Sequence, residues 1–245
     1  MKIDFTNKTV LITGASRGIG REIAKEFFRL GANIISTSTK PIKIRIPKNK
    51  RNRWKHIIAD FADEIALKNF FQELIDIKRI DILINNAGIN EINTFTEVKK
   101  NDFLRINKVN LSTPFLISQK IAQKMIRNKS GKIINISSIF GVISKKKRAS
   151  YSTSKAGLIG LTKAMALDLA SYNILVNSIS PGFVSTELTK RILKKNEKNE
   201  LRKNVPLSRF AECSEIVNLV LYLSSKYNTY LTGQNIVIDG GYTIQ

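Results

Sequence analysis

The feature that most constrains the fold is a glycine-rich loop between an apolar run and a helical pattern. Thr9-Val10-Leu11-Ile12-Thr13 is typical of a buried strand, and glycines follow at positions 14, 18 and 20. Arg21 to Leu30 then places its apolar residues at helical spacing and ends before Gly31. A strand, a tight glycine turn and a helix predict a βαβ unit whose loop backbone can approach a phosphate.

The same alternation of apolar strands and helical patterns continues to the end of the chain. Further strands are predicted at Asn33–Ser38, Ile80–Ile84, Lys132–Ile136, Leu175–Ile179 and Gln234–Ile238. Longer helical patterns cover Asp102–Asn128, Ser152–Ser171 and Cys213–Ser224. Strands that alternate with helices predict an α/β fold, a single-domain Rossmann-type doubly wound parallel sheet that spans residues 1–245.

The segment Lys40–Lys55 departs from this alternation. It is strongly basic and contains Pro41 and Pro47. Because proline in a helix interior costs about 3 kcal/mol, a crossover helix here should be short or absent. We expect an irregular connection.

The chain is strongly basic, with 41 Lys and Arg against 19 Asp and Glu and a net charge of +22. Basic residues cluster at Lys43–Lys55, Lys145–Arg148 and Lys190–Lys203, but lysines are spread through the whole chain. Such clusters are most often solvated loops, so we predict no nucleic-acid partner and no membrane partner. The alternative function of these clusters is to attract an anionic substrate or an acidic protein.

The chain has one cysteine, Cys213, and one histidine, His56, so an internal disulfide is excluded and no metal site is predicted. The first strand pattern begins within nine residues of Met1, without a secretory signal pattern, and no apolar run has the length of a bilayer span. We therefore expect a cytoplasmic protein.

The residues with catalytic chemistry are Ser138, Tyr151 and Lys155. On a helix, positions 151 and 155 share a face, so the lysine ammonium is expected to stabilise a tyrosinate and lower the tyrosine pKa. Ser138, thirteen residues earlier, can donate a hydrogen bond to an oxygen that gains negative charge. Such a set can protonate an oxygen whose carbon receives a hydride, which predicts a carbonyl reductase.

The chain provides its own control for this motif. Tyr222 and Lys226 have the same spacing, but Arg209 stands where the serine would be. Tyr222 lies on an apolar helix face, and we expect it to be a core residue.

Over nearly its whole length the chain resembles the short-chain dehydrogenase/reductase family. The motifs that carry the resemblance are Thr13-Gly14-x-x-x-Gly18-x-Gly20, Asn85-Asn86-Ala87-Gly88, the set Ser138, Tyr151 and Lys155, and Pro181-Gly182. The resemblance implies that Tyr151 is the general acid, that Lys155 holds the ribose hydroxyls, and that Ser138 positions the carbonyl. It also implies that Asn110 supports a proton-relay water; the alternative is a helical asparagine bonded to backbone.

The family pattern also implies which residues hold a nicotinamide cofactor. They are Gly14, Ser16, Arg17, Gly18, Ile19, Gly20, Thr39, Asp60, Phe61, Asn86, Ala87, Gly88, Tyr151, Lys155, Pro181, Gly182, Val184 and Thr186. NAD-preferring relatives carry an acidic residue at the end of the second strand, but Ser36–Lys40 has no carboxylate. Arg17 can pair with a 2′-phosphate, and Lys40 adds positive charge, so the predicted cofactor is NADPH.

Within the family, the local runs are most similar to those of bacterial reductases that act on 3-oxoacyl chains of acyl-carrier protein. This similarity implies an acidic acyl-carrier protein partner and a homotetramer built on the helices at Asp102–Asn128 and Ser152–Ser171. The departures are the missing helix at Lys40–Lys55, the basic loop before Tyr151, and Tyr172-Asn173 where these reductases often carry an arginine, whereas Lys129 keeps a positive charge at the other docking position. Two alternatives remain open: action on another ketone, alcohol or sugar, and a non-catalytic Rossmann regulator.

Overall fold

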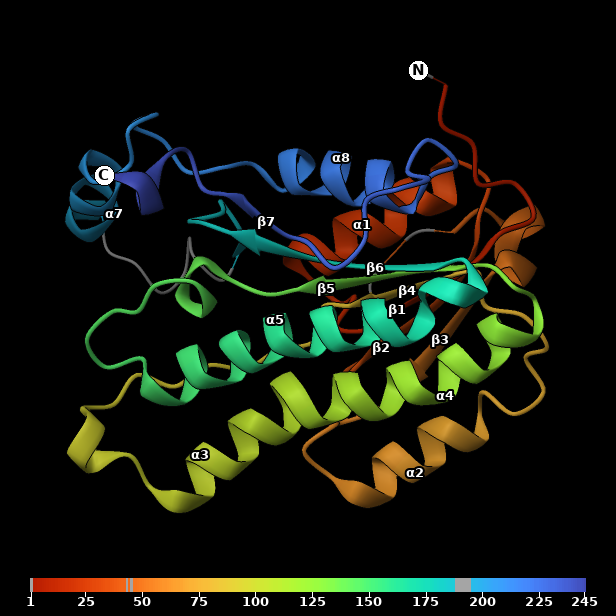
Figure 1. Ribbon diagram of the computed structural model, residues 1–245, viewed down its shortest axis with the longest axis horizontal. Coiled ribbons are helices and arrows are strands. Elements are labelled where there is room, and N and C mark those ends of the chain that lie inside the picture. Colours follow the sequence, from red (N-terminus) through yellow and green to blue (C-terminus); the bar gives the residue numbers. More distant parts are fainter. Residues whose placement is uncertain (1, 43, 45, 188–194) are drawn as a thin grey trace.

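The computed structural model describes residues 2–42, 44, 46–187 and 195–245, and its centre is a seven-stranded parallel sheet (Figure 1). The strands are ordered β3-β2-β1-β4-β5-β6-β7 across the sheet. Their bounds are β1 Thr9–Ile12, β2 Asn33–Ser38, β3 Trp54–Ile58, β4 Ile82–Asn85, β5 Gly131–Ile136, β6 Ile174–Pro181 and β7 Asn235–Ile238. The strand order reverses between β1 and β4, which confirms the predicted doubly wound sheet and marks the switch point where such sheets bind ligands.

Helices cover both faces of the sheet (Figure 1). One face carries α1 (Gly18–Arg29) and α8 (Cys213–Ser224), and the other carries α2 (Glu64–Gln72), α4 (Thr113–Arg127) and α5 (Ala149–Leu169). Helix α3 (Lys100–Asn107) continues the line of α4, and α7 (Lys195–Lys203) lies near the C-terminus. Short 3₁₀ helices form at Lys48–Arg53, Phe95–Glu97, Ile139–Gly141, Ala170–Tyr172 and Tyr242–Ile244.

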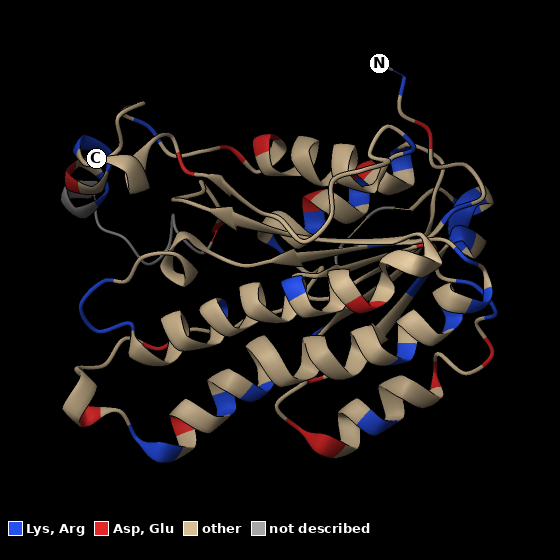
Figure 2. Ribbon diagram, viewed as in Figure 1, with Lys and Arg blue, Asp and Glu red and all other residues tan. Residues whose placement is uncertain are grey.

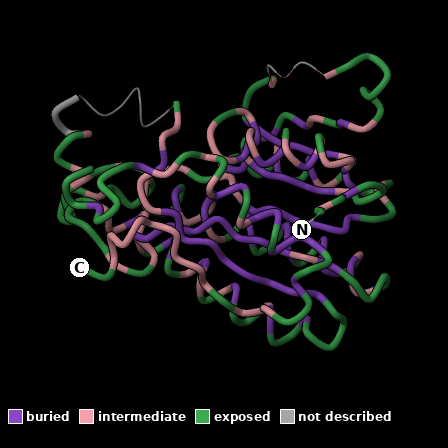
Figure 3. The backbone as a smooth tube through the Cα atoms, turned by 90° about the horizontal axis from the view of Figure 1, so that it is seen from above, coloured by how far each residue is buried: buried purple, intermediate pink, exposed green. Residues whose placement is uncertain are grey.

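Most residues of the central strands are buried (Figure 3). The strands divide their side chains between two hydrophobic cores, because successive side chains in a strand point to opposite faces. In β1, Val10 and Ile12 join the core beneath α1 and α8, whereas Leu11 joins the core beneath α2, α4 and α5. Each of these three side chains is fully buried. Sheet and helices are thereby fixed to one another, and the loops at the carboxyl ends of the strands stand on a rigid base.

Among the described helices and strands, β3, α2 and α7 were not predicted from the sequence. Strand β3 pairs with β2 in parallel and forms the edge of the sheet. Helix α2 begins after Asp63, whose Oδ1 accepts a hydrogen bond from the Ala66 backbone N–H at 2.7 Å. The described part of the basic segment Lys40–Lys55 contains no α-helix, as expected, but only the 3₁₀ helix at Lys48–Arg53 and the first two residues of β3.

The helix predicted over Asp102–Asn128 is interrupted by a π-helical turn. Residues Lys108–Ser112 form this turn between α3 and α4. A π turn contains one residue more than an α turn and is often found at functional sites. Asn110 lies inside it and is completely buried.

Basic residues lie on several parts of the surface (Figure 2). The loop residues Lys145, Lys146 and Lys147 are exposed, as are Lys48, Lys50 and Arg51 of the 3₁₀ helix before β3. The third predicted cluster, Lys190–Lys203, begins outside the described residues. None of the helices in the described ranges combines the length and apolar character that a bilayer crossing needs.

Candidate active site

The glycine loop is tied to the start of the segment that follows β4. Asn86 Nδ2 donates to the carbonyl oxygens of Thr13 and Gly14, both at 3.0 Å. A Cβ at Gly20 would lie 2.3 Å from Asn86 Nδ2 and 2.4 Å from the Gly14 oxygen, so only glycine fits. Gly14 and Gly18 also need positive φ angles, of 69° and 55°. The glycines therefore allow the loop to lie directly on the Asn86 amide.

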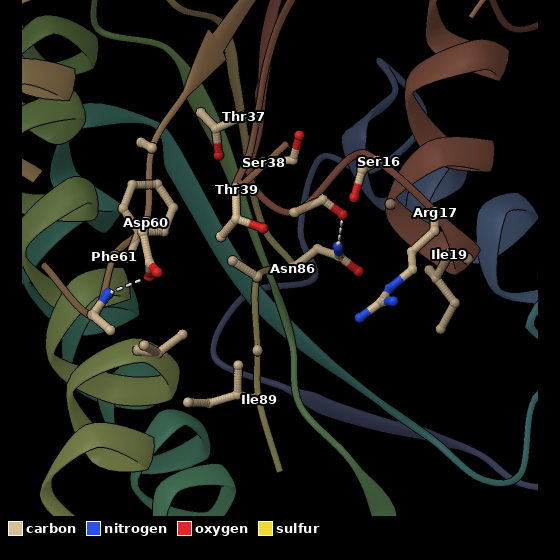
Figure 4. A pocket seen from close by; sticks show the side chains of 18 of the residues that line it. Ser16, Arg17, Ile19, Thr37, Ser38, Thr39, Asp60, Phe61, Asn86 and Ile89 are labelled. Atoms are coloured by element: carbon tan, nitrogen blue, oxygen red, sulfur yellow. Dashed lines mark hydrogen bonds between the residues drawn. The ribbon is translucent and has the colours of Figure 1, made fainter. Parts of the chain in front are cut away.

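A pocket of about 300 Å³ opens beside this loop at the switch point of the sheet (Figure 4). In Figure 4, the side chains at the end of β2 stand between Ser16 and Arg17 on one side and Asp60 and Phe61 on the other. The predicted residues that line it are Gly14, Ser16, Arg17, Gly18, Ile19, Gly20, Thr39, Asp60, Phe61, Asn86, Ala87, Gly88 and Thr186.

An adjoining pocket of about 560 Å³ contains the catalytic candidates. Ser138, Tyr151 and Lys155 line it together with Pro181, Gly182 and Val184, which follow at the end of β6. Both pockets are lined by Arg17, Asn86, Gly88 and Thr186, so they form one continuous cleft. All the residues predicted to hold the cofactor thus lie along a single cleft.

Ser138 and Tyr151 are brought together by the short 3₁₀ helix at Ile139–Gly141 and the start of α5. Ser138 is buried and caps that 3₁₀ helix, its Oγ accepting from the Phe140 N–H at 3.2 Å. Its side chain is also hydrogen-bonded to Tyr151. The two hydroxyl groups therefore converge on one point, where a substrate oxygen could meet both.

Lys155 lies one helical turn beyond Tyr151 and is buried. Its ammonium donates to the Ile136 carbonyl oxygen at 2.8 Å, and burial lowers the pKa of Lys155 to about 8. An ammonium carries three N–H groups, so it keeps donors for further partners.

The pKa of Tyr151 is raised, contrary to our expectation that the lysine would lower it. Burial of the phenol is the largest effect, while the hydrogen bond to Ser138 and the charge of Arg148 act in the opposite direction. Desolvation of the tyrosinate therefore outweighs the stabilising contacts. A phenol that stays protonated is suited to donate a proton rather than to accept one.

Asn110 is the one catalytic candidate that lines neither pocket. Its side chain accepts from the Ile89 N–H at 2.8 Å and donates to the Ile89 carbonyl at 2.9 Å and to Ser154 Oγ at 3.0 Å. It is thus bonded to backbone, as in the alternative stated above, and it links the π turn to the segment after β4 and to α5. Its role in a proton relay stays a prediction.

Several residues of the cleft were not predicted. Thr37 lines the first pocket, and its buried Oγ1 has no hydrogen-bond partner among the described residues. Arg105 lines both pockets and pairs at 3.0 Å with Glu91, which lines the second. Neither carries a motif signal, although Thr37 is buried on a strand where a polar side chain needs a partner.

Lys129 and the basic loop at Lys145–Lys147 do not lie together in one chain. Lys129 comes directly before β5, whereas Ser138 follows the other end of that strand, and six strand residues span about 20 Å. The loop Lys145–Lys147 stands at the active-site end, directly before α5. Of these two sites, the loop is the one that can form a basic rim beside the cleft.

Comparison with known proteins places this site in a family. A family model described as enoyl-(acyl carrier protein) reductase matches residues 14–243. The chain is 37% identical to the 3-oxoacyl-[acyl-carrier-protein] reductase FabG of Aquifex aeolicus, covering 98% of this chain and 99% of the relative. It is also 37% identical to the FabG of Buchnera aphidicola from Schizaphis graminum, with 98% of each chain covered.

Solved structures agree in fold. A 4-hydroxyisoleucine dehydrogenase mutant complexed with NADH and succinate is 36% identical with a TM-score of 0.91, covering 97% of this chain and 99% of the other. A gluconate 5-dehydrogenase from Burkholderia cenocepacia in complex with NADP and tartrate is 28% identical with a TM-score of 0.88, covering 99% and 97%.

The sheet order, the glycine loop and the cleft define a Rossmann-fold protein that uses a nicotinamide cofactor. With the matches over nearly its full length, the chain belongs to the short-chain dehydrogenase/reductase family. It is an oxidoreductase that acts on CH–OH and C=O groups.

Proposed function

We propose that this protein reduces 3-oxoacyl chains carried by acyl-carrier protein, with NADPH as the cofactor, in fatty-acid elongation. The observation that carries the proposal is the continuous cleft that joins the glycine loop to Ser138, Tyr151 and Lys155. The FabG relatives, whose names state this reaction, supply the substrate class.

The residues of the cleft fit a dinucleotide. Gly14 and Gly20 have no room for a Cβ because the loop lies against Asn86 and Ala87. Arg17, at the N-cap of α1, makes no side-chain capping bond, so the N–H groups at the start of α1 remain available to a phosphate. The buried Thr37 Oγ1 has no hydrogen-bond partner among the described residues, and a ribose or base in the pocket could supply one. NADPH, when bound, supplies the hydride.

The protein's own groups then handle the oxygen and its proton. Ser138 donates a hydrogen bond to the keto oxygen and, with Tyr151, holds it in place. Tyr151 gives its phenolic proton to that oxygen as charge develops. Lys155, anchored to the Ile136 carbonyl, keeps N–H groups that would hold the ribose hydroxyls of the cofactor.

NADPH rather than NADH is supported by the charges at the pocket rim. Arg17 and Thr39 line the pocket, and no carboxylate stands among Ser36–Lys40. A guanidinium binds a phosphate strongly, whereas a carboxylate at the end of β2 would repel it.

The partner and assembly follow from the same proposal. The exposed loop at Lys145–Lys147 supports an acidic carrier protein as the partner. Apolar side chains of Phe115 and Leu116 on α4 and Leu167 on α5 are exposed, which supports a homotetramer through these helices. A single cysteine supports a reducing, cytoplasmic location.

The deciding experiment compares turnover on 3-oxoacyl-acyl-carrier-protein thioesters with turnover on a panel of free ketones and keto-sugars. We expect the highest kcat/KM for the protein-bound thioester. Faster reduction of a free ketone or sugar would favour another substrate of the family. Binding of NADPH without turnover on any of them would favour a regulator.

A further inference from the structure

A chain of hydrogen bonds links the edge strand β3 to the rim of the cofactor pocket. Trp54 Nε1 donates to Ser36 Oγ at 2.9 Å, and Ser36 Oγ lies 2.9 Å from His56 Nδ1. His56 Nε2 lies 3.1 Å from Ser38 Oγ, and Ser38 Oγ donates to the Lys40 carbonyl at 2.5 Å. We call these five residues the His56 relay. They are side chains from two neighbouring strands and one backbone group at the end of β2.

The relay has only one consistent direction. An indole N–H can only donate and a carbonyl can only accept. Since Ser38 gives its hydrogen to Lys40, it must accept from His56 Nε2, which therefore carries the ring proton. His56 Nδ1 is then free to accept from Ser36. Every donor and acceptor is satisfied only when His56 is neutral with its proton on Nε2.

Charge on His56 is not needed for this arrangement. Burial lowers the pKa of His56, more than the bonds to the backbone of Lys40 and Ser36 raise it. Two cations near it in the sequence are engaged elsewhere: Lys55 on β3 pairs with Glu73 at 2.7 Å, and Arg53, just before β3, donates to the carbonyls of Phe28 and Ala32. His56 therefore acts through hydrogen bonds.

The relay ends where the adenosine ribose of a dinucleotide is held in Rossmann sheets. Ser36 and His56 lie side by side in the parallel register of β2 and β3. Ser38 is the last residue of β2, and both Ser38 and Thr39 line the pocket (Figure 4). The conformation of Ser38–Lys40 thus sets the shape of this part of the rim.

Ser38 itself is held in the sheet, because the Ala59 N–H donates to its carbonyl oxygen at 3.0 Å, so the relay matters most for the residues that follow it. No α-helix follows β2, since the described residues between Ser38 and β3 contain only the 3₁₀ helix at Lys48–Arg53. Pro41 restricts Lys40 to extended conformations and has no backbone N–H that could donate to the sheet. The Lys40 carbonyl oxygen accepts a hydrogen bond from Ser38 Oγ, and His56 Nε2 lies 3.4 Å from the same oxygen.

We propose that His56 is a positioning residue for cofactor specificity: it holds Ser38, Thr39 and Lys40 in the arrangement that receives the ribose 2′-phosphate of NADPH. This inference rests on the proposed preference for NADPH. It assigns that preference to a residue of the neighbouring strand that does not line the pocket.

Direct binding tests the proposal without relying on activity. Calorimetry would give the Kd of NADP⁺ and of NAD⁺ for the native protein, for His56→Ala and His56→Gln, and for Lys55→Ala as the control on the same strand. We expect His56→Ala to raise the Kd of NADP⁺ about tenfold, the scale of one or two hydrogen bonds, and the Kd of NAD⁺ by less than about twofold. His56→Gln, whose amide nitrogen can donate to Ser38, should recover most of the preference. Lys55→Ala should match the native protein.

Two further variants separate positioning from folding. If His56 acts through Ser38, then the double variant with His56→Ala and Ser38→Ala should bind NADP⁺ no more weakly than either single variant. His56→Asn, which is too short to reach Ser38, should behave like His56→Ala and would replace it if that variant did not fold.

The outcomes are distinct. A native preference for NADP⁺ that survives in His56→Ala would overturn the relay and leave the proposed cofactor standing. If His56→Ala weakened the binding of NADP⁺ and NAD⁺ equally, His56 would have only a structural role, and the inference would also be overturned. A native protein that binds both equally would overturn the relay and the NADPH assignment together.

Discussion

The ammonium nitrogen of Lys155 lies 5.8 Å from the centre of the Tyr151 ring, on the next turn of the same helix. The lysine thus faces the phenol without being the group that sets its pKa, which responds to burial, to Ser138 and to Arg148. Each of these neighbours can be changed separately.

Removing the Tyr151 hydroxyl should abolish most of the chemistry. Tyr151→Phe keeps the ring but loses the acidic proton, so kcat should fall by at least about 10²-fold. The Kd for NADPH should change little. Near-normal turnover in a folded variant would remove Tyr151 from the mechanism.

Tyr222→Phe is the matched control, because Tyr222 and Lys226 repeat the motif spacing. The expectation that Tyr222 is a core residue was wrong: its side chain is 37% exposed on α8. Its removal should leave both stability and rate almost unchanged.

The rate of reduction should fall as Lys155 loses its proton. Burial lowers the Lys155 pKa from 10.5 to about 8, so the ammonium is present below that pH and lost above it. We expect kcat/KM to decline above pH about 8. Because the pKa of Lys155 is lower in the folded protein than in the unfolded chain, its titration makes the folded state more stable as pH rises from about 8 to 10.5. A loss of stability caused by Lys155 therefore cannot explain the decline in kcat/KM. A flat profile up to pH 10 would contradict this assignment.

Arg148 should tune Tyr151 from the start of the same helix. Its guanidinium lies 5.7 Å from the centre of the Phe140 ring, and its buried Nη1 has no hydrogen-bond partner among the described residues. Since its charge lowers the Tyr151 pKa, Arg148→Gln should raise that pKa further. Alcohol oxidation, which needs the tyrosinate as a base, should then shift to higher pH, whereas Arg148→Lys should stay near the native profile. Identical pH profiles for all three proteins would exclude this effect.

Arg17 should favour NADPH. Arg17→Glu replaces a phosphate partner with a repelling charge, so the ratio of kcat/KM for NADPH to that for NADH should fall at least about tenfold. Lys25→Glu makes the same charge change on an exposed part of α1 outside the pocket and should leave the ratio unchanged. Equal or better use of NADH by the native enzyme would refute the NADPH prediction.

The basic loop before α5 should speed the encounter with an acidic carrier protein. Changing Lys145, Lys146 and Lys147 to glutamate should lower kcat/KM for the protein-bound substrate but not for an uncharged short β-keto ester. Raising the salt beyond physiological strength, where the screening length is about 8 Å, should have the same selective effect. The same reversal at Lys48, Lys50 and Arg51, which are exposed before β3, is the control. If both substrates respond alike to the loop variant, the loop is only a solvated surface.

Much of the site could be predicted from the sequence because its motifs lie at strand ends. Gly14, Ser138 and Pro181 belong to different segments, yet parallel strands bring their carboxyl ends to one edge of the sheet. Strong apolar runs made those strands recognisable. The position of the cleft then followed from the parallel order of the strands, which end at the same edge of the sheet.

The features missed in the sequence differ in how much local signal they carry. Strand β3 alternates Trp54, His56 and Ile58 with residues of the opposite face, but it is short and follows a basic segment. The carboxylate of Asp63 and the buried Leu67 and Phe70 could have indicated α2. The raised pKa of Tyr151 could not be foreseen, because burial depends on packing from segments far away in the chain.

The π-helical turn at Lys108–Ser112 also sets the rotation of α3 about the helix axis relative to α4. An α-helix turns about 100° per residue, so one additional residue rotates everything after it by that amount. With it, α3 presents Arg105 to the cleft while α4 presents Ile117 and Ile121 to the core. Shortening the turn by one residue would put these two faces out of step, so that a correctly packed α4 would carry α3 with Arg105 swung away from the cleft.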